Sequence, residues 1–262
     1  MNKLLRNFIL GIISQERREK IARTFMNSIG YGESNLEVEA KALAYFAQKT
    51  HLKNFSILDI GASVGSYSKN LLKYSEGDIV CFEPSKVAFK KLEKNFFRDI
   101  NSKNSRIKIY NLGLINKKIN VKSYLNIYSA FGGSDQGSLL RKNQKTIVKE
   151  KACFINIDQA LKLVENQVVG IKLDIEGYEY ELIKSFHKLF LNPNFICIQF
   201  EYGVNTFESK VTLEHFYNLL SKYGFVIKRI SPYGLVNVNE YSYLLEVNWP
   251  TNYIAVKKTF LN

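Results

Sequence analysis

Carboxylates at the ends of apolar runs are the side chains of this sequence best placed to do chemistry. They are, in chain order, Asp59, Glu83, Asp174, Glu176 and Glu201. A carboxylate at the end of a buried strand can accept hydrogen bonds from hydroxyl groups. When burial and like charges raise its pKa, it can also take a proton from a substrate. The sequence therefore predicts a site rich in acids.

The turn that follows Asp59 indicates which ligand such a site would take. It reads GASVG, with Gly61 and Gly65 at its ends and Ala62 and Ser63 in the middle. Glycines at a turn let the backbone approach a ligand closely, but a dinucleotide-binding turn requires a further middle glycine, G-x-G-x-x-G. The Asp59 carboxylate would also repel a phosphate. The pattern predicts a nucleoside without a pyrophosphate, which fits S-adenosylmethionine.

The remaining acids are expected to border the same crevice. Glu83 ends the second apolar run, in register with the acid that accepts hydrogen bonds from a ribose in nucleoside-binding folds. Asp174 and Glu176 end the fourth such run and Glu201 ends the fifth. Ligands of doubly wound sheets bind outside the carboxyl ends of the strands, so these side chains should meet there.

Alternating strand-like and helix-like segments must position these residues. Strands are expected at 55–61, 78–85, 106–114, 168–177, 194–203, 225–231 and 252–258, and helices at 35–50, 65–75, 86–97, 178–190 and 211–224. A further short strand and helix are expected within 153–164. Strands separated by helices predict right-handed crossovers and a parallel sheet. We predict an α/β fold: a doubly wound, Rossmann-like sheet, mostly parallel with an antiparallel C-terminal strand.

The 262 residues and 46% hydrophobic content allow one large domain. We predict that this domain covers residues 35–262 and that residues 1–34 form an amphipathic helical extension. Residues 116–151 are polar and rich in Gly and Ser, and they are predicted to form a long functional loop. The three cysteines, Cys81, Cys153 and Cys197, lie far apart in apolar runs and are predicted to be buried free thiols.

The basic N-terminus leaves two alternatives open. Apolar residues at helical spacing, with Lys and Arg between them, predict either a helix docked on the core or a second subunit, or weak contact with a membrane surface. The apolar run is too short to span a bilayer, and no signal-peptide cleavage site follows it. A cytoplasmic protein is therefore expected. The net charge of +13 favours an anionic partner, although the lysines are spread along the chain.

Several motifs taken together resemble a known family. They are D-x-G-A-x-x-G from Asp59 followed by F-E-P, then L-G-L at 112–114, S-D-Q-G-S-L-L at 134–140, I-K-L-D-I-E-G-Y-E at 171–179 and I-Q-F-E-Y at 198–202. The sequence is similar to the FkbM family of S-adenosylmethionine-dependent O-methyltransferases, which are class I methyltransferases, from about residue 35 to residue 202. The resemblance implies methyl transfer to a hydroxyl of a sugar, a polysaccharide building block or a macrolide-type natural product.

The predicted cofactor site follows the order of the strands. Its residues are Asp59, Gly61, Ala62, Gly65, Ser66, Tyr67, Glu83, Pro84, Asn111, Leu112, Gly113 and Asp174. The first strand and turn should line the amino-acid and ribose portion, Glu83 should hold the ribose hydroxyls, and the segment from Asn111 to Gly113 should flank the adenine. Asp174 or Glu176 is predicted to be the catalytic base. Glu201 would help to orient the acceptor.

Other assignments of these residues stay open. Glu176 could instead cap the next helix while Asp174 only contacts the cofactor. Three acids in one crevice also suit Mg²⁺, which is the less favoured alternative to a site without metal. His215 could reach the site from its helix, although the three histidines are predicted to lie on helix surfaces.

The predicted acceptor is a sugar, a nucleotide sugar or a glycan building block. The Ser/Gly segment 129–140 and the aromatic segment 231–253, with Tyr233, Tyr241, Tyr243, Trp249 and Tyr253, would border it or simply pack. A nucleic-acid acceptor is disfavoured, because the sequence after the fourth strand reads LDIEG and not the N/D-P-P-Y/F run of amino-methylating enzymes. A non-catalytic nucleoside-binding module and a homo-oligomer are further alternatives.

Overall fold

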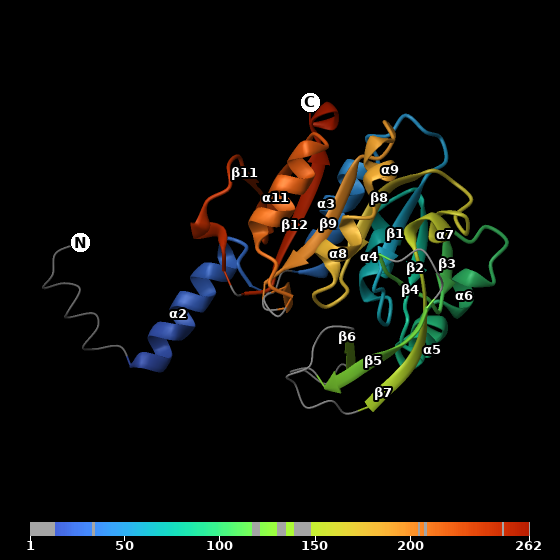
Figure 1. The fold of residues 1–262 in the computed structure, drawn as a ribbon, viewed down its shortest axis with the longest axis horizontal. Coiled ribbons are helices and arrows are strands. Elements are labelled where there is room, and N and C mark those ends of the chain that lie inside the picture. Colours follow the sequence, from blue (N-terminus) through green and yellow to red (C-terminus); the bar gives the residue numbers. More distant parts are fainter. Residues whose placement is uncertain are drawn as a thin grey trace, which may run out of the picture.

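The computed structural model describes residues 14–32, 35–116, 121–129, 135–138, 148–203, 205–206, 209–247 and 249–261. An eight-stranded sheet runs through the molecule in the order β11-β10-β12-β9-β8-β1-β2-β3 (Figure 1). Its strands are β1 (Ser56–Ile60), β2 (Asp78–Phe82), β3 (Ile107–Tyr110), β8 (Val168–Leu173), β9 (Cys197–Tyr202), β10 (Phe225–Ser231), β11 (Gly234–Val238) and β12 (Thr251–Lys257). The predicted doubly wound α/β sheet is confirmed.

Helices cover both faces of this sheet and bury two separate apolar clusters. They are α3 (Leu36–Ala47), α4 (Ser66–Tyr74), α5 (Lys86–Asn95), α6 (Phe97–Ile100), α7 (Ile157–Leu161), α8 (Glu179–Ile183), α9 (His187–Leu191) and α11 (Leu213–Lys222). Along β1, Ile57 packs with α3 and α4 on one face, whereas Leu58 and Ile60 pack with α8, α9 and α11 on the other. Because successive side chains of a strand point to opposite faces, one apolar run supplies both clusters.

Side-chain caps fix where the helices next to the site begin. The Asn35 side chain accepts a hydrogen bond from the backbone of Glu37 and so starts α3. The Ser85 hydroxyl does the same for α5. An N-cap of this kind satisfies a backbone N–H that has no partner within the helix. Both helices therefore begin beside the carboxyl ends of the strands, where the sequence predicts the site.

The C-terminal strands are antiparallel, as predicted, but they are more elaborate than the sequence indicated. β12 inserts between β9 and β10 and runs antiparallel to both. β11, which was not predicted, forms a tight hairpin with β10 at the edge of the sheet. A short exposed strand with the pattern GLVNV carries too weak an alternation to be recognised by its sequence.

Residues 116–151 were predicted to form a long loop, and that prediction is wrong for much of the segment. A second sheet, in the order β4-β7-β5-β6, contains β4 (Gly113–Leu114), β5 (Val121–Ser129), β6 (Asp135–Ser138) and β7 (Val148–Ile155). The predicted third strand, 106–114, is also split, because the chain leaves the main sheet after β3 and joins the second sheet as β4. The polar composition of a solvated hairpin resembles that of a loop.

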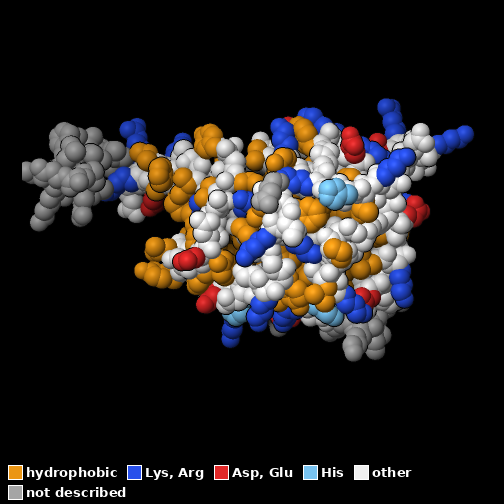
Figure 2. Space-filling model, turned by 90° about the horizontal axis from the view of Figure 1, so that it is seen from above, with side chains coloured by type: hydrophobic (Ala, Val, Ile, Leu, Met, Phe, Trp, Pro, Cys, Tyr) orange, Lys and Arg blue, Asp and Glu red, His pale blue; other side chains and the backbone are white. Residues whose placement is uncertain are grey.

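The N-terminal helix lies apart from the main body (Figure 1). It is α2 (Gln15–Ser28), none of whose residues is buried. Residues 1–13, which contain most of the predicted apolar stripe, lie outside the described residues. Within the described part of the chain, no helix is long and apolar enough to cross a membrane. Figure 2 shows Lys and Arg side chains distributed over the visible face rather than gathered in one tract.

The three cysteines are free thiols, as predicted, but one prediction about their burial is wrong. Cys81 and Cys197 are buried, whereas Cys153 is exposed. Cys153 lies on β7 between Ala152 and Phe154, which are both buried. The alternation along this strand therefore turns the thiol outward. The sequence-based prediction failed because it assigned the whole apolar run to a strand covered on both faces.

Candidate active site

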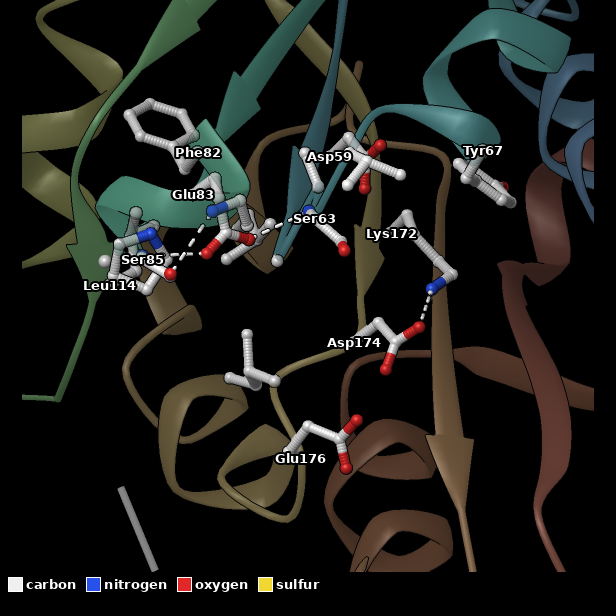
Figure 3. Close-up of a pocket in the computed structure, with 18 of the residues that line it drawn as sticks. Asp59, Ser63, Tyr67, Phe82, Glu83, Ser85, Leu114, Lys172, Asp174 and Glu176 are labelled. Carbon is white, nitrogen blue, oxygen red and sulfur yellow. Dashed lines mark hydrogen bonds and ion pairs between the residues drawn. The ribbon is translucent and has the colours of Figure 1, made fainter. Parts of the chain in front are cut away.

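A cavity of about 310 Å³ opens at the carboxyl ends of β1, β2 and β8 (Figure 3). The predicted residues that line it are Asp59, Gly61, Ala62, Ser66, Tyr67, Glu83, Pro84, Gly113, Asp174 and Glu176. Additional wall residues that the sequence had not singled out include Leu36, Leu114, Phe154 and Lys172. The position outside the strand ends is the one expected for a ligand of a doubly wound sheet.

Gly61 brings the end of β1 into contact with the end of β8. Its φ of +87° is a backbone conformation that side chains disfavour, and a Cβ placed there would lie 1.9 Å from the carbonyl oxygen of Asp174. The Gly61 N–H donates to the Phe82 carbonyl, and the Asp174 N–H donates to the Ile60 carbonyl. Glycine at this position therefore sets the spacing between the two strand ends that carry the acids.

Gly65 begins α4 and packs against side chains of the following segment. It caps α4 in a left-handed conformation, and a Cβ there would meet the side chains of Phe96 and Leu92 within 2.7 Å. Gly65 is not among the residues that line the cavity. Packing against Phe96 and Leu92 thus accounts for the second glycine of GASVG, and its contact with the cofactor stays a prediction.

Glu83 is held by the backbone at one end of the cavity. Its carboxylate accepts hydrogen bonds from the N–H groups of Ser63 and Ser85, each at 2.8 Å. Burial raises the pKa of Glu83 to about 7, against the lowering effect of these hydrogen bonds. Because a carboxylate has about four lone-pair sites, two remain for hydroxyl donors from a ligand. The two hydroxyl groups of a ribose could donate hydrogen bonds to these two sites.

The segment expected to flank an adenine is only partly where it was predicted. Asn111 does not line the cavity, because its side-chain amide donates to the carbonyls of Glu83 and Pro84. Leu112 packs against the core cluster instead. Gly113 does line the cavity, and a Cβ there would collide with the ring of Phe154 at 2.3 Å.

The second sheet supplies the apolar wall that the sequence missed. Leu114 of β4 and Phe154 of β7 line the cavity next to Gly113. Glu150 of β7 joins this sheet to the segment that begins α5. Its carboxylate accepts hydrogen bonds from the Ser85 hydroxyl at 2.9 Å and from the Lys86 N–H. The segment after β3 therefore forms one wall of the site.

Lys172 is the functional residue that sequence reasoning overlooked. It is 2% exposed, and its ammonium donates to the Asp174 carboxylate at 2.9 Å. It pairs across the sheet with Asp59 in the register of β1 and β8. The carboxylates of Asp174, Glu39 and Asp59 together raise the pKa of Lys172 against the effect of burial. A lysine inside the apolar run VVGIKL was the signal in the sequence that could have identified it.

Asp59 is buried beneath the turn and is held from two directions. The Ser68 hydroxyl of α4 donates to its carboxylate. Burial raises the pKa of Asp59, whereas the Lys172 ammonium and the Ser68 hydrogen bond act to lower it. The buried cation thus balances two acids, Asp59 below the turn and Asp174 at the cavity wall.

A layer of buried polar side chains continues behind this ion pair. The Tyr67 hydroxyl donates to the Gln199 side chain at 3.0 Å, and the Gln199 amide donates to Glu39 of α3 at 3.0 Å. Glu39 also accepts from Asn252 of β12 at 3.1 Å. The network ties the wall residue Tyr67 to three elements of the fold. Hydrogen bonds between buried side chains of several elements restrict their relative positions.

Glu176 and Glu201 share one amide donor. The Asn205 side-chain amide donates to Glu176 at 2.6 Å and to Glu201 at 3.3 Å. Glu176 lines the cavity, with a φ of +55° that is unusual for a residue with a side chain. Glu201 does not line it, contrary to the prediction. Burial and the neighbouring carboxylates of Asp174, Glu176 and Glu179 raise the pKa of Glu201 well above its usual value.

The N-cap residue of α8, Tyr178, makes no side-chain cap hydrogen bond, and the loop before this helix is held by Glu179. The buried Glu179 carboxylate accepts from the N–H groups of Ile175 at 2.8 Å and of Gly177 at 2.9 Å, which shapes the loop after β8. Burial raises its pKa to about 7. The Glu176 side chain is left on the cavity side of this loop (Figure 3).

The aromatic segment 231–253 does not border this cavity, and its contact with the substrate stays a prediction. None of its five named aromatic residues lines the wall. Tyr253 is fully buried in the core and stacks on Phe200, whereas Tyr233 is 86% exposed. Most of the Ser/Gly segment 129–140 lies outside the described residues.

The histidine and metal alternatives can be placed as well. His215 lies in the first turn of α11, where its ring is within hydrogen-bond distance of Thr212, and it does not line the cavity. Among the residues that the structure describes, no group of three or more His, Cys, Asp or Glu side chains is arranged to hold a metal ion. The acids of the site are instead paired with Lys172, backbone amides and Asn205.

The arrangement fits a nucleoside with a short charged tail. At one end, Glu83 offers two lone-pair sites to hydroxyls, beside the apolar side chains of Leu114 and Phe154. At the other end, Asp174 and Glu176 present carboxylates to the same cavity. Carboxylates can accept hydrogen bonds from an ammonium group, compensate a nearby positive charge, or accept a proton from an alcohol.

Comparison with solved structures gave remote likenesses. The chain is similar to the methyltransferase FkbM from Methylobacillus flagellatus KT, with 14% identity, a TM-score of 0.49 and 86% of this chain covered. It spans 56% of the length of that structure. It is also similar to an O-methyltransferase from Bacillus cereus in complex with SAH (13% identity, TM-score 0.47, 94% of this chain and 93% of that one). No curated protein matched the chain.

A family profile gives the decisive comparison. The profile described as the methyltransferase FkbM domain matches residues 59–227, from Asp59 of the first motif to β10. This range is well over half of the chain, and it contains the GASVG turn, Glu83 and the KLDIEG segment. The chain belongs to the FkbM family of S-adenosylmethionine-dependent methyltransferases.

Proposed function

We propose that this protein transfers a methyl group from S-adenosylmethionine to a hydroxyl of a sugar, a nucleotide sugar or a glycan building block. The observation that carries the proposal is the two-ended cavity. Glu83 accepts hydrogen bonds at one end, and Asp174 and Glu176 present carboxylates at the other. The cofactor supplies an activated methyl group. The side chains must bind it, align an acceptor with it and remove one proton.

Glu83 would bind the ribose hydroxyls of the cofactor. Its two backbone hydrogen bonds fix the orientation of the carboxylate before any ligand arrives. Gly61 brings the backbone of the turn close to the Asp174 carbonyl. Leu114 and Phe154 offer an apolar wall for the adenine ring of the cofactor. A hydrogen-bond acceptor that is already oriented loses little conformational entropy when the cofactor binds.

We assign the catalytic base to Glu176 and contact with the cofactor to Asp174. The Lys172 ammonium donates to the Asp174 carboxylate, so one of its oxygens is already engaged in an ion pair. Glu176 faces the cavity from a left-handed backbone conformation, and such strain is concentrated at functional sites. The Asn205 amide donates to the Glu176 carboxylate at 2.6 Å and so orients it.

The acceptor class is supported by the family resemblance rather than by cavity residues. The aromatic segment that would have stacked on a sugar lies away from the wall. The net charge of +13 favours an anionic acceptor, for which a nucleotide sugar is suited. A hydroxyl acceptor also agrees with the carboxylate beside the cavity, because an alcohol must lose its proton on methylation.

Methyl transfer from labelled S-adenosylmethionine tests the proposal directly. The purified chain is incubated with panels of free sugars, nucleotide sugars, glycans and RNA, and label in each product is measured. Label in a carbohydrate hydroxyl is expected. Label in RNA alone would replace the proposed acceptor, and cofactor binding without transfer to any panel would indicate a binding module.

Two isosteric variants test the assignment of the base. We expect Glu176→Gln to lower kcat by about 10²- to 10⁴-fold with unchanged affinity for S-adenosylhomocysteine. Asp174→Asn is expected to weaken that affinity, because it removes a charge from the cofactor site. If Glu176→Gln retains full turnover and Asp174→Asn does not, the roles of the two residues are reversed.

A further inference from the structure

The N-terminal helix α2 presents a face with no partner in the described part of the chain. Ile21 and Phe25, one helical turn apart, are 58% and 64% exposed. Together with Arg17, Lys20, Thr24 and Ser28 they line one shallow surface of the helix. Large exposed apolar side chains side by side on a helix mark a contact surface.

The charges on this face have one sign. Arg17 stands one turn before Ile21, Lys20 directly precedes Ile21, and no carboxylate lies among the residues of the surface. Arg18 and Arg23 add positive charge on the rest of the helix, which also carries Glu16 and Glu19. Apolar side chains flanked by cations match an anionic surface that has an apolar layer beneath it.

The end of α2 is fixed to the body beside another exposed aromatic residue. The Arg229 side chain of β10 donates to the Ile29 carbonyl at 2.9 Å, and Gly30 packs against Ile230 and Ser231. Tyr233, in the turn between β10 and β11, follows closely along the chain and is 86% exposed. Figure 2 shows hydrophobic and basic side chains together at this end of the molecule.

The sequence that precedes the helix has the same character. Residues 1–13 lie outside the described part of the chain, and they read MNKLLRNFILGII. This stretch contains Lys3 and Arg6, no acid, and apolar residues at most other positions. Basic and apolar residues thus occur on both sides of the polar stretch SQERREK at 14–20.

We propose that α2 docks the protein on an anionic membrane surface, with Ile21 and Phe25 inserted among the lipids and Arg17 and Lys20 bound to headgroups. A second copy of the chain is the competing occupant. Two copies meeting through this face would place four cations, Arg17 and Lys20 of each, in one interface with no carboxylate on the surface to pair with them. The net charge of +13 adds to this repulsion.

Sedimentation with vesicles tests the proposal on the full chain. One set of vesicles is phosphatidylcholine alone, and the other contains equal parts of phosphatidylcholine and phosphatidylglycerol. The protein is expected to sediment with the second set only, and to be released in roughly 1 M NaCl, where the Debye length is about 3 Å. A protein that stays in solution with both sets overturns the proposal.

The double variant Ile21→Ser/Phe25→Ser tests the inserted residues. Partitioning to the anionic vesicles is expected to fall about tenfold or more, because the apolar area that enters the lipid is lost. The matched control is Phe97→Ser/Leu191→Ser, on exposed residues of α6 and α9 at the other end of the molecule (Figure 1). Because no residue of α2 is buried, the double variant is expected to keep its fold. Binding of S-adenosylhomocysteine by the variant verifies this. Unchanged partitioning contradicts the proposal.

Charge reversal tests the headgroup contacts. Arg17→Glu/Lys20→Glu is expected to abolish sedimentation, whereas Lys90→Glu/Lys91→Glu, on exposed lysines of α5, should retain most of it. An equal loss for both pairs would show attraction by the overall charge, with no special role for α2. Light scattering then measures the oligomeric state of the protein. If Ile21→Ser/Phe25→Ser dissociates a dimer without affecting vesicle binding, the occupant of this face is a second copy of the chain.

Discussion

The two ends of the cavity hold their carboxylates by different means. Glu83 is fixed by two neutral backbone amides, and burial raises its pKa to about 7. Asp174 is fixed by the buried ammonium of Lys172. Burial leaves the Glu83 carboxylate able to gain or lose a proton near neutral pH, whereas the position of the Asp174 carboxylate depends on its ion pair with Lys172. One end is therefore sensitive to pH and the other depends on a single cation.

Removal of that cation should have the largest effect. Lys172→Met leaves Asp59 and Asp174 without their compensating charge, and Asp59 is buried. We expect the free energy of unfolding to fall by about 3–5 kcal/mol, as measured by urea denaturation. Lys73→Met, which removes an exposed ion pair with Glu37, should leave the midpoint nearly unchanged. Equal effects of the two changes would contradict the role of Lys172.

Gly61 joins the two ends, and its substitution should rank second. Gly61→Ala places a Cβ against the Asp174 carbonyl and forces a left-handed alanine, so we expect a loss of about 2–4 kcal/mol in unfolding free energy. Gly224→Ala is the matched control, because its φ is +77° and nothing lies within 4 Å of the added Cβ. It should cost about 1–2 kcal/mol. The difference between the two measures the contact between β1 and β8.

Glu83→Gln should weaken the cofactor end alone. The variant loses the charge that strengthens hydrogen bonds to the ribose hydroxyls, and its amide group faces a backbone N–H. Affinity for S-adenosylhomocysteine should fall about 10- to 100-fold by calorimetry. The control is Glu93→Gln, on an exposed residue of α5. A variant with native affinity would show that the ligand does not contact Glu83.

The smallest effect expected is a dependence of binding on pH. With a pKa of about 7, Glu83 is protonated in much of the free protein below neutrality, whereas the ribose requires the ionised form. Affinity should therefore fall by up to about tenfold per pH unit below pH 7, and binding should release protons near pH 7. Calorimetry in two buffers with different ionisation heats measures that release. Glu83→Gln should abolish it.

The stability of the ligand-free protein should show the opposite dependence on pH. The pKa values of Glu83 and Glu179 rise from 4.5 to about 7 on folding, so the folded state binds more protons than the unfolded state between these values. Their contribution to stability is complete below about pH 4.5 and is lost as the pH rises through 7.

The sequence predicted the parts of the site that follow strict spacing. Asp59, Glu83 and the loop after β8 lie where parallel strands end, because apolar runs and the intervening helices determine those positions. It did not show that Gly65 serves packing or that Asn111 braces the backbone of the Glu83 loop. Both depend on contacts between segments far apart in the chain.

The sequence also failed where composition and structure diverge. The second sheet has a polar sequence typical of a loop, and its contribution to the cavity through Phe154 depends on pairing that no local pattern reveals. Lys172 was not predicted, because the acids of the same motif were the residues assigned to chemistry. A charged residue within a buried apolar run should have been treated as a signal in itself.

The position of Cys153 offers a practical route to observing this site. It is the exposed one of the three thiols, and it lies next to the cavity residue Phe154 on the outer face of β7. Burial raises the pKa of both Cys81 and Cys197, so a maleimide dye would label Cys153 selectively. The native chain therefore accepts a fluorescent reporter on the outer face of the strand that carries Phe154, without any engineered cysteine.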